Sequence, residues 1–301
     1  MVDPDFDPPA GVAQTLAPGL LRVLAPNPSP MTWRGTNSYL VGQRSLAVID
    51  PGPASPSHLK ALLGAIDNRP VSAILVSHSH VDHSALAGDL ARATGAPVLA
   101  FGDSGTGRSP VMTQLAKGGF LGGGEGVDAD FHPDRTLADG AVISGDDWRI
   151  IAHWTPGHMG NHMCFQWNDA LFTGDHVMGW ATSLVSPPDG DLTRFMASCR
   201  RLLLRPDRVY YPGHGAPIDD PAARVSALIA HRLMREGQIL HSLECGPATA
   251  GEITARLYTE VADALLPAAQ RNVLAHLIDL VQRDRVQSTA PLSASARFAL
   301  S

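Results

Sequence analysis

The segment VSAILVSHSHVDH spans residues 71–83 and joins an apolar run to a cluster of metal-ligand side chains. The run from Val71 to Ser77 is short and apolar, which predicts a strand buried in a sheet that is covered on both faces. Directly after it, three imidazoles and one carboxylate stand within six residues, at a strand end where loops place functional groups. They are His78, His80, Asp82 and His83. Imidazole and carboxylate groups are the ligands expected for zinc or a similar transition metal, so the segment predicts a metal site.

In three later segments, an apolar strand is followed by a turn containing glycine and a ligand-type residue. They read TPGH (residues 155–158), TGDH (173–176) and YPGHG (211–215). Glycine lets the backbone turn sharply and pass close to a metal. Together with the first cluster, these segments predict seven ligands at one edge of a sheet. The three added ligands are His158, Asp175 and His214.

The chain has 301 residues, which allows one large domain or a large domain with a small one. Residues 1–19 are rich in proline and aspartate and are expected to form an N-terminal arm. Over residues 20–224, expected strands alternate with expected helices, which predicts βα units and a catalytic domain of the mixed α/β (α+β) class. Residues 225–301 are mostly helical and end in a hairpin, which is the order of a winged helix. The expected helices are 59–66, 86–94, 192–204, 227–243, 249–258 and 268–283, and the expected terminal hairpin pairs 285–289 with 297–300.

The glycine-rich residues 102–126 interrupt this alternation with little periodicity. A long irregular insertion in a compact domain is usually a functional loop or a mobile one. Two hypotheses follow for this segment, a lid over the site and a surface loop.

Composition excludes several classes of protein. An apolar fraction of 44% and a charged fraction of 17% exclude a wholly disordered chain. No apolar run approaches the roughly 18 residues of a membrane span, and the acidic segment from Met1 to Pro9 lacks the basic residues of a secretory signal peptide. Three widely spaced cysteines make no disulfide framework, so we expect a reducing, cytoplasmic setting. A net charge of −6 makes nucleic acid an unfavourable partner.

The motifs HxHxDH, TPGH, GD and PGHG, in this order, resemble the metallo-β-lactamase superfamily over roughly residues 20–220. The resemblance implies an αββα sandwich with a dinuclear metal site. It implies that one metal is bound by His78, His80 and His158, a second by Asp82, His83 and His214, and that Asp175 bridges them. It also implies two divalent ions, with zinc as the default and iron or manganese suited to the same nitrogen and oxygen donors. The tail from about residue 225 and the segment RGTNSYLVG (34–42) resemble the β-lactamase-like protein 2 branch. The bridging aspartate implied at Asp175 resembles the glyoxalase II, lactonase and nuclease branches.

The expected chemistry follows from two adjacent metals. Two divalent ions can share a hydroxide and lower the pKa of its parent water toward neutrality. That hydroxide attacks an electrophilic carbonyl carbon or a phosphorus, and Asp82 can orient it and accept its proton. We expect hydrolysis of a thioester or ester of a small acyl substrate. Because the resemblance implies that true β-lactamases lack a bridging aspartate such as Asp175, we do not expect a true β-lactamase.

Two other functions remain as alternatives, a metal-dependent single-stranded RNA endonuclease and a non-catalytic metal-binding docking protein. The tail from His231 to Gln287 has six arginines against seven acids, so it predicts no basic stripe for nucleic acid. The winged helix is therefore expected to be a packing or dimer element, and a homodimer is the expected assembly.

Further residues are candidates on weaker grounds. Thr36 and Asn37, and Trp180 and Ser183 in the segment after Asp175, are candidates for contacts to substrate. His162 follows His158 by four residues and is a candidate partner that orients a ligating imidazole.

Overall fold

Strand β5 (Val71–Leu75), which precedes the histidine cluster, lies inside a seven-stranded sheet of order β1-β2-β3-β4-β5-β6-β7 in the computed structural model. The structure describes residues 5–118, 126–293 and 295–301. Strands β1 to β4 pair antiparallel, and strands β4 to β7 pair parallel. The other strands of this sheet are β1 (Ala13–Ala17), β2 (Leu20–Leu24), β3 (Asn37–Val41), β4 (Leu46–Ile49), β6 (Val98–Ala100) and β7 (Arg135–Thr136).

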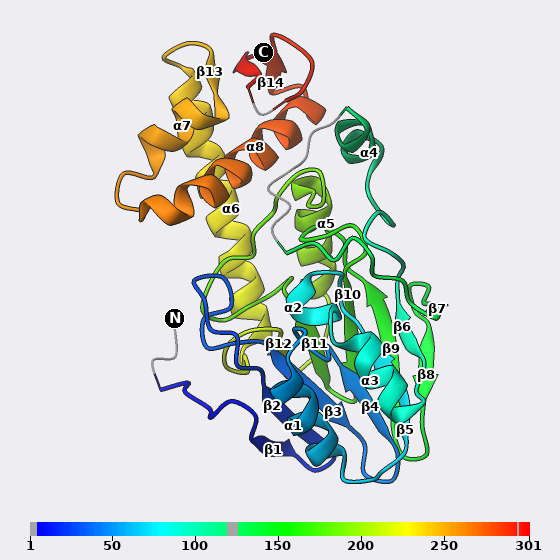
Figure 1. Cartoon of the computed structure of the whole chain (residues 1–301). Helices are drawn as coiled ribbons and strands as arrows, with labels where there is room; N and C mark the ends of the chain where they lie inside the picture. Colours follow the sequence, from blue (N-terminus) through cyan, green and yellow to red (C-terminus); the bar gives the residue numbers. More distant parts are fainter. Residues whose placement is uncertain (1–4, 119–125, 294) are drawn as a thin grey trace.

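A second sheet has five strands in the order β12-β11-β10-β9-β8 and packs face to face with the first (Figure 1). The core between the sheets is apolar and aromatic, and the rings of Tyr39 from β3 and Phe172 from β11 meet at 5.0 Å. The strands are β8 (Val142–Ser144), β9 (Arg149–Trp154), β10 (Met163–Trp167), β11 (Ala170–Gly174) and β12 (Val209–Pro212).

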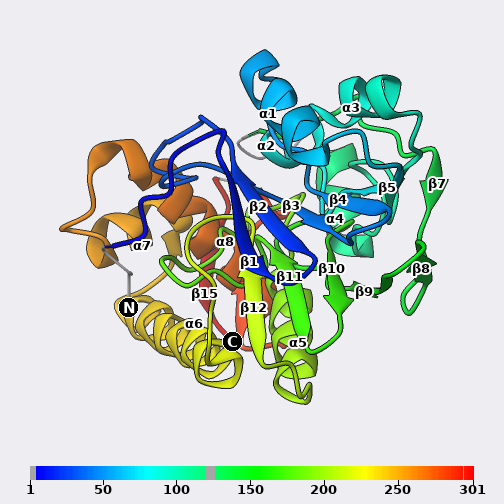
Figure 2. The ribbon, with the colours of Figure 1, turned by 90° about the horizontal axis from the view of Figure 1, so that it is seen from below.

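Helices cover the outer face of each sheet (Figures 1 and 2). Helices α1 (Pro56–Ile66) and α3 (Ala87–Thr94) pack on the first sheet, and α5 (Leu192–Leu203) and α6 (Pro221–Leu243) pack on the second. The short helix α2 (Val81–Ser84) lies within the histidine cluster. These four layers confirm the expected αββα sandwich.

The C-terminal part contains α6, α7 (Ala250–Leu257), the short helix η1 (Asp263–Leu265) and α8 (Leu266–Gln282). A small sheet of order β13-β15-β14 completes it, with β13 (Ala248–Thr249), β14 (Val286–Ser288) and β15 (Arg297–Leu300). The hydroxyl of Thr249 and the carboxylate of Glu252 form the capping box that starts α7. The order of helices and hairpin confirms the expected winged helix. Helix α6 crosses the expected domain boundary at residue 225 and packs on both α5 and α8.

Two segments differ from the sequence-based expectation. Residues 13–17, expected in the N-terminal arm, form β1 because they pair with β2. Within the expected irregular insertion 102–126, helix α4 (Pro110–Lys117) forms because Ser109 caps its start and Pro110 favours its first turn. Its Met112 and Leu115 pack into the core of the C-terminal part. Residues 119–125, where the lid or loop hypothesis also falls, lie outside the described residues.

None of the helices in the described part of the chain combines the length and the apolarity needed to cross a membrane.

Candidate metal centre

The four sequence segments with ligand-type residues meet at one edge of the two sheets. His78 and His80 follow β5, His158 follows β9, and Asp175 and His214 follow β11 and β12. Two sets of side chains present ligand atoms that lie within 4.8 Å of one another in each set. The first set is His78, His80, His158 and Asp175, and the second set is Asp82, His83 and His214. The structure therefore brings together all seven residues that the sequence singled out.

The first set converges on a small volume. Nδ1 of His80 lies 2.9 Å from Nε2 of His78 and 3.1 Å from Nε2 of His158. Oδ2 of Asp175 lies 3.8 Å from Nε2 of His158. Ligand atoms of a tetrahedral zinc ion bound at about 2.0–2.1 Å are separated by roughly 3.4 Å, so one ion fits among these atoms after small adjustments.

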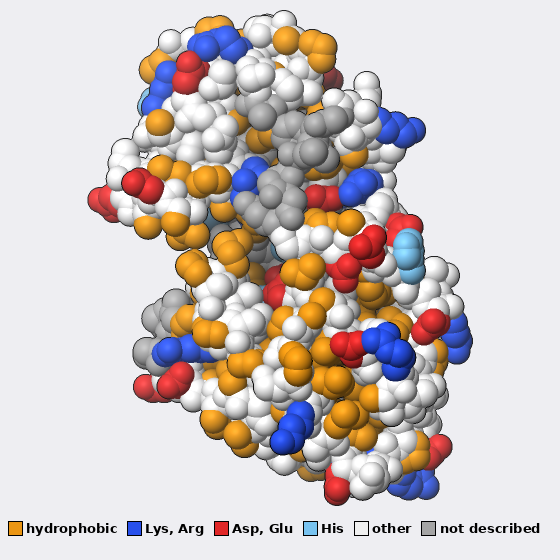
Figure 3. Space-filling model, viewed as in Figure 1, with side chains coloured by type: hydrophobic (Ala, Val, Ile, Leu, Met, Phe, Trp, Pro, Cys, Tyr) orange, Lys and Arg blue, Asp and Glu red, His pale blue; other side chains and the backbone are white. Residues whose placement is uncertain are grey.

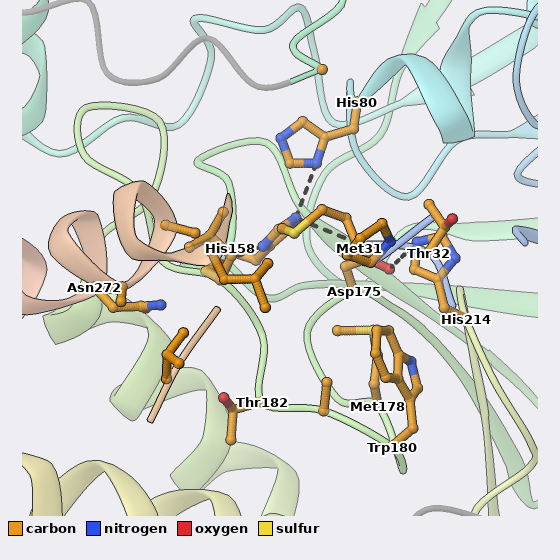
Figure 4. A pocket seen from close by; sticks show the side chains of 18 of the residues that line it. Met31, Thr32, His80, His158, Asp175, Met178, Trp180, Thr182, His214 and Asn272 are labelled. Atoms are coloured by element: carbon orange, nitrogen blue, oxygen red, sulfur yellow. Dashed lines mark hydrogen bonds and ion pairs between the residues drawn. The ribbon is translucent and has the colours of Figure 1, made fainter. Parts of the chain in front are cut away.

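The second set shares Asp175 with the first. Oδ2 of Asp82 lies 3.2 Å from Nε2 of His214 and 3.5 Å from Nε2 of His83. The other oxygen of Asp175, Oδ1, lies 3.5 Å from Nε2 of His83 and 3.4 Å from Nε2 of His214. Asp175 thus turns one oxygen toward each set, and Figure 4 shows it between His158 and His214.

Backbone carbonyls fix the orientation of two of the imidazoles. Nδ1 of His158 donates to the carbonyl of Leu184 at 2.7 Å, and Nδ1 of His214 donates to the carbonyl of Gly35 at 3.0 Å. In the neutral form of each ring, which is the form that binds a metal, the proton sits on Nδ1 and the lone pair on Nε2 points into the site. Hydrogen bonds of this kind are usual for metal-ligating histidines.

Asp50 orients two further imidazoles and was missed by the sequence analysis. Its carboxylate accepts hydrogen bonds from Nδ1 of His83 at 2.9 Å and from the hydroxyl of Ser77 at 2.7 Å. The same hydroxyl lies 2.9 Å from Nδ1 of His78. A signal was present, since Asp50 follows the apolar strand β4 and precedes Pro51-Gly52. This is the same pattern of strand, ligand-type residue and glycine turn.

Glycines let the backbone approach the site. A Cβ atom on Gly213 would lie 2.6 Å from Oδ1 of Asp175 and 2.6 Å from Cε1 of His83, which no real side chain tolerates. On Gly174, with φ of +47°, a Cβ would lie 2.8 Å from Nε2 of His162. These two glycines of the strand-end segments are therefore required by close contacts within the cluster.

The charges of the two sets differ. Burial, together with the neighbouring His158, lowers the pKa of His80 to about 3. Burial also lowers the pKa values of His78 and His158, so the three rings of the first set are neutral at pH 7. Neutral imidazole is the form that binds a metal.

The second set carries paired charges. Burial disfavours a charged ring at His214, but the carboxylates of Asp175 and Asp82 outweigh it and raise the pKa of His214 to about 10. Burial likewise opposes ionisation of Asp82 and Asp175, but His83 and His214 hold the pKa values of both carboxyls below their usual range. Without a metal, the protonated rings of His83 and His214 supply the positive charge that pairs with the two carboxylates.

The residues fit a pair of divalent ions. Nε2 of His83 and Oδ1 of Asp175 are buried, and neither atom has a hydrogen-bond partner. A buried polar atom without a partner is costly, and a bound cation would satisfy both. The donors are imidazole nitrogens and carboxylate oxygens, which suit zinc, iron and manganese.

This charge arrangement predicts a pH dependence of stability. Folding raises the pKa of His214 from 6.5 to about 10. The resulting stabilisation of metal-free protein is complete below a pH of about 6.5 and is lost as the pH rises through about 10. We expect the Tm of chelated wild-type protein to fall over this range more steeply than the Tm of chelated His214→Asn. Parallel Tm profiles for the two proteins would contradict the charge assignment.

Of the two predicted substrate contacts in the segment after Asp175, Trp180 lines the cavity and Ser183 does not. Trp180 lines the cavity described below, and its ring stacks on Trp33 with centroids 5.6 Å apart. Ser183 is fully buried instead, because its hydroxyl donates to the carbonyl of His176 at 2.8 Å. Its side chain is not among those that line the cavity.

Thr36 and Asn37 are buried, and each forms hydrogen bonds that position a candidate ligand or the loop that carries one. The hydroxyl of Thr36 donates to Oδ2 of Asp82 at 3.3 Å. The amide of Asn37 donates to the carbonyls of Pro212 and Gly215, at 3.0 and 2.9 Å. Asn37 therefore holds the loop that carries His214, and neither residue lines the cavity.

His162 packs beside the first set of ligands. Its ring lies 5.2 Å from the ring of His78, and its Nδ1 lies 2.9 Å from the hydroxyl of Thr155. Its Nε2 is buried without a hydrogen-bond partner. Its ring packs against the ring of the candidate ligand His78.

A cavity of about 590 Å³ opens beside the candidate ligands. His80, Asp82, His158, Asp175 and His214 contribute to one side of it. Apolar side chains form most of the remaining wall, and part of that wall comes from the C-terminal part, from Tyr258 to Asn272.

The cavity lies between the larger part and the C-terminal part. In Figure 4, Asn272 of α8 and His214 lie at opposite sides of the view. Figure 3 shows a hollow between the C-terminal part and the larger part below it, bordered by hydrophobic side chains. The cavity volume suits a small-molecule ligand.

Comparison with known families and proteins gives consistent matches. Residues 31–214 match the metallo-beta-lactamase superfamily, and residues 249–291 match the beta-lactamase associated winged helix domain. The atrochrysone carboxyl ACP thioesterase of Aspergillus fumigatus is 31% identical over 283 residues, covering 86% of this chain and 81% of that protein. The beta-lactamase-like protein 2 homolog of Drosophila melanogaster is 30% identical over 285 residues, covering 90% of this chain and 91% of that protein.

Solved structures show the same fold. A metallo-beta-lactamase family protein from Thermus thermophilus has a TM-score of 0.76 and 27% identity, covering 95% of this chain and 100% of that one. A beta-lactamase domain protein from Burkholderia ambifaria has a TM-score of 0.78 at 22% identity, covering 99% of this chain and 96% of that one. Both similarities extend through the C-terminal part.

Proposed function

Because this chain belongs to the metallo-β-lactamase superfamily, we propose that it is a dinuclear metal-dependent hydrolase of a thioester or ester of a small acyl substrate. The observation that carries the proposal is the cavity of about 590 Å³, which has ionisable ligand groups on one side and mainly apolar side chains elsewhere. An apolar acyl group fits such a wall, with its carbonyl carbon at the ligands. The similarity to a protein named as a thioesterase favours a thioester as the bond that is cleaved.

The two sets of ligand atoms would hold one divalent ion each, with Asp175 contributing one oxygen to each ion. We propose zinc, to which these nitrogen and oxygen donors are suited. Two bound ions would lower the pKa of a shared water toward neutrality and polarise the carbonyl oxygen of the substrate.

We assign Asp82 as the carboxylate that accepts the proton of the attacking water. Its side chain is 21% exposed, against 11% for Asp175, so it is the more open of the two carboxylates. The hydroxyl of Thr36 donates to Oδ2 and holds the carboxylate in position. Asp82 thus orients the water and accepts its proton; the water oxygen bonds to the acyl carbon and the carbon–sulfur bond breaks, which gives a carboxylic acid and a thiolate. A thiol has a pKa of about 8.5, so the thiolate leaves without a dedicated proton donor.

Initial rates on a matched panel test this proposal. The zinc-loaded protein is assayed with acyl thioesters, a homoserine lactone, a phosphodiester and short single-stranded RNA, each beside Asp82→Ala. We expect hydrolysis of a thioester or lactone that falls by at least about 10²-fold in Asp82→Ala, since the variant loses both a ligand and the proton acceptor.

The control for the panel is Asp146→Ala, which removes a carboxylate from the loop before β9, outside both ligand sets. This variant is expected to keep wild-type rates. Cleavage of RNA alone would replace the proposal with a nuclease activity. Thioester hydrolysis that is equal in Asp82→Ala and wild type would contradict the assigned role of Asp82.

A further inference from the structure

Helix α6 presents three basic side chains to the cavity, those of His231, Arg232 and Arg235. They are distinct from the candidate metal ligands, which all lie in the larger part, after its strands or in the short helix α2. Arg232 is 3% exposed, and the other two are half-buried. Basic side chains in a cavity with mainly apolar walls need a physical explanation, because burial of a charge is costly without a partner.

The contacts of Arg232 are with neutral groups, including the ring of Phe195, whose centroid lies 5.3 Å from the guanidinium carbon. Its guanidinium donates to the carbonyl of Ser183 and, at 3.1 Å, to the amide oxygen of Asn272, which are both neutral acceptors. Its Nε is buried without a hydrogen-bond partner. Burial lowers the pKa of Arg232 to about 10, which still leaves the side chain charged at pH 7.

The side chain of Arg235 packs on the ring of Tyr258, and among the described residues its positive charge also lacks a carboxylate partner. Its guanidinium carbon lies 4.1 Å from the centroid of the Tyr258 ring, and its Nε is buried without a hydrogen-bond partner. The acid next to it on α6, Glu236, forms an ion pair with Arg283 instead. Within the residues that the structure describes, neither Arg232 nor Arg235 forms an ion pair with a carboxylate.

Two histidines close to these arginines also lack hydrogen-bond partners. Nδ1 of His231 is buried without a partner, and both ring nitrogens of the buried His276 on α8 lack one. Burial, together with the basic side chains of Arg232 and Arg235, lowers the pKa of His276 well below its usual value. The cluster of His231, Arg232, Arg235 and His276 therefore holds only basic side chains, and the Nε–H group of each arginine is buried without a hydrogen-bond partner.

We propose that Arg232 and Arg235 bind an anionic group of the substrate, a carboxylate or a phosphate, at the end of the cavity formed by the C-terminal part. Guanidinium groups match the planar geometry of these anions and form charge-assisted hydrogen bonds with them. Tyr258 and Asn272, which contact the two arginines, place this end of the cavity in the C-terminal part. This inference rests on the proposed function and narrows it to acyl thioesters that carry an anion away from the scissile carbonyl.

Pairs of thioesters that differ only in one anionic group test the inference. One pair places a carboxylate on the acyl group, with hexanoyl against adipoyl thioesters of neutral N-acetylcysteamine, and succinyl and suberoyl thioesters vary the reach. The other pair places a phosphate on the thiol, with hexanoyl pantetheine against hexanoyl pantetheine 4′-phosphate. We expect kcat/KM to favour the anionic member of one pair by at least about tenfold, mainly through KM. The pair that shows the preference identifies which part of the substrate carries the anion.

Arg235→Met is the decisive variant, because Arg235 makes fewer hydrogen bonds within the protein than Arg232 and its removal is less disruptive to folding. We expect the preference for the anionic member to fall to about one in Arg235→Met. Arg208→Met is the matched control, since Arg208 is exposed and precedes β12, at the opposite end of that strand from His214. This control is expected to retain the wild-type preference.

Two results overturn the inference in distinguishable ways. If neutral and anionic members are hydrolysed equally by wild type, the anion site is wrong while the proposed function stands. If no thioester is hydrolysed, the proposed function fails, and calorimetric titration with adipate and hexanoate decides the anion site separately. Tighter binding of adipate that is lost in Arg235→Met supports the site, and equal affinity for the two acids overturns it.

Discussion

Asp175→Ala is expected to lower kcat/KM on the proposed thioester substrate by on the order of 10³-fold or more, which corresponds to about 4 kcal/mol. The reason is that its two oxygens face different sets of ligands. Oδ1 lies 3.4 Å from Nε2 of His214, and Oδ2 lies 3.8 Å from Nε2 of His158. Removal of this one carboxylate weakens both proposed metal positions and the spacing between them. The measurement is kcat/KM together with elemental analysis of gel-filtered protein.

Asp189→Ala is the matched control for this variant. Asp189 is a partly buried aspartate that pairs with Arg108 and belongs to neither ligand set. It should retain wild-type metal content even if it loses some stability. If Asp175→Ala kept both metals and stayed within tenfold of the wild-type rate, Asp175 would not bridge the two positions.

His158→Ala is expected to lose metal from the first position and to lower kcat/KM by on the order of 10²–10³-fold. Loss of an outer hydrogen-bond partner typically costs about 10–100-fold in metal affinity or activity, and loss of a ligand should cost more. The expected metal content after gel filtration is close to one ion per chain. Wild-type metal content in this variant would contradict the ligand assignment.

His153→Ala provides the comparison for His158→Ala. His153 lies in β9, and its Nε2 is 3.1 Å from the amide oxygen of Gln166, away from both ligand sets. This variant removes an imidazole from the same strand region and is expected to retain metal and rate. A similar loss of metal in both variants would indicate general destabilisation of the region around β9.

The strand-end ligands could be predicted from sequence because their signals are local. Each ligand-type side chain follows an apolar strand within a few residues, in three of the four segments through a turn that contains glycine, and parallel strands bring such ends to one edge. Asp50 has the same local pattern after β4, but its role depends on two partners, Ser77 and His83, that lie far along the chain. Only the folded sheet brings Ser77 and His83 next to Asp50, so the sequence around Asp50 does not reveal this contact.

The substrate-contact predictions depend on side-chain direction, which the sequence does not give for an irregular segment. Ser183 and Trp180 lie three residues apart on one irregular segment, yet only Trp180 lines the cavity. An irregular segment has no fixed periodicity from which such directions can be read. The cavity wall formed by the C-terminal part and the docking of α4 are likewise contacts between distant segments, which the sequence pattern alone does not specify.

The number of metal ions that activity requires tests the central claim most directly. Chelated wild-type protein is titrated with zinc while the rate of thioester hydrolysis is recorded, and the bound metal is measured by elemental analysis. The account predicts that activity appears with the metal and reaches its maximum at two ions per chain. Full activity at one ion per chain, or activity that survives chelation, would contradict a dinuclear centre.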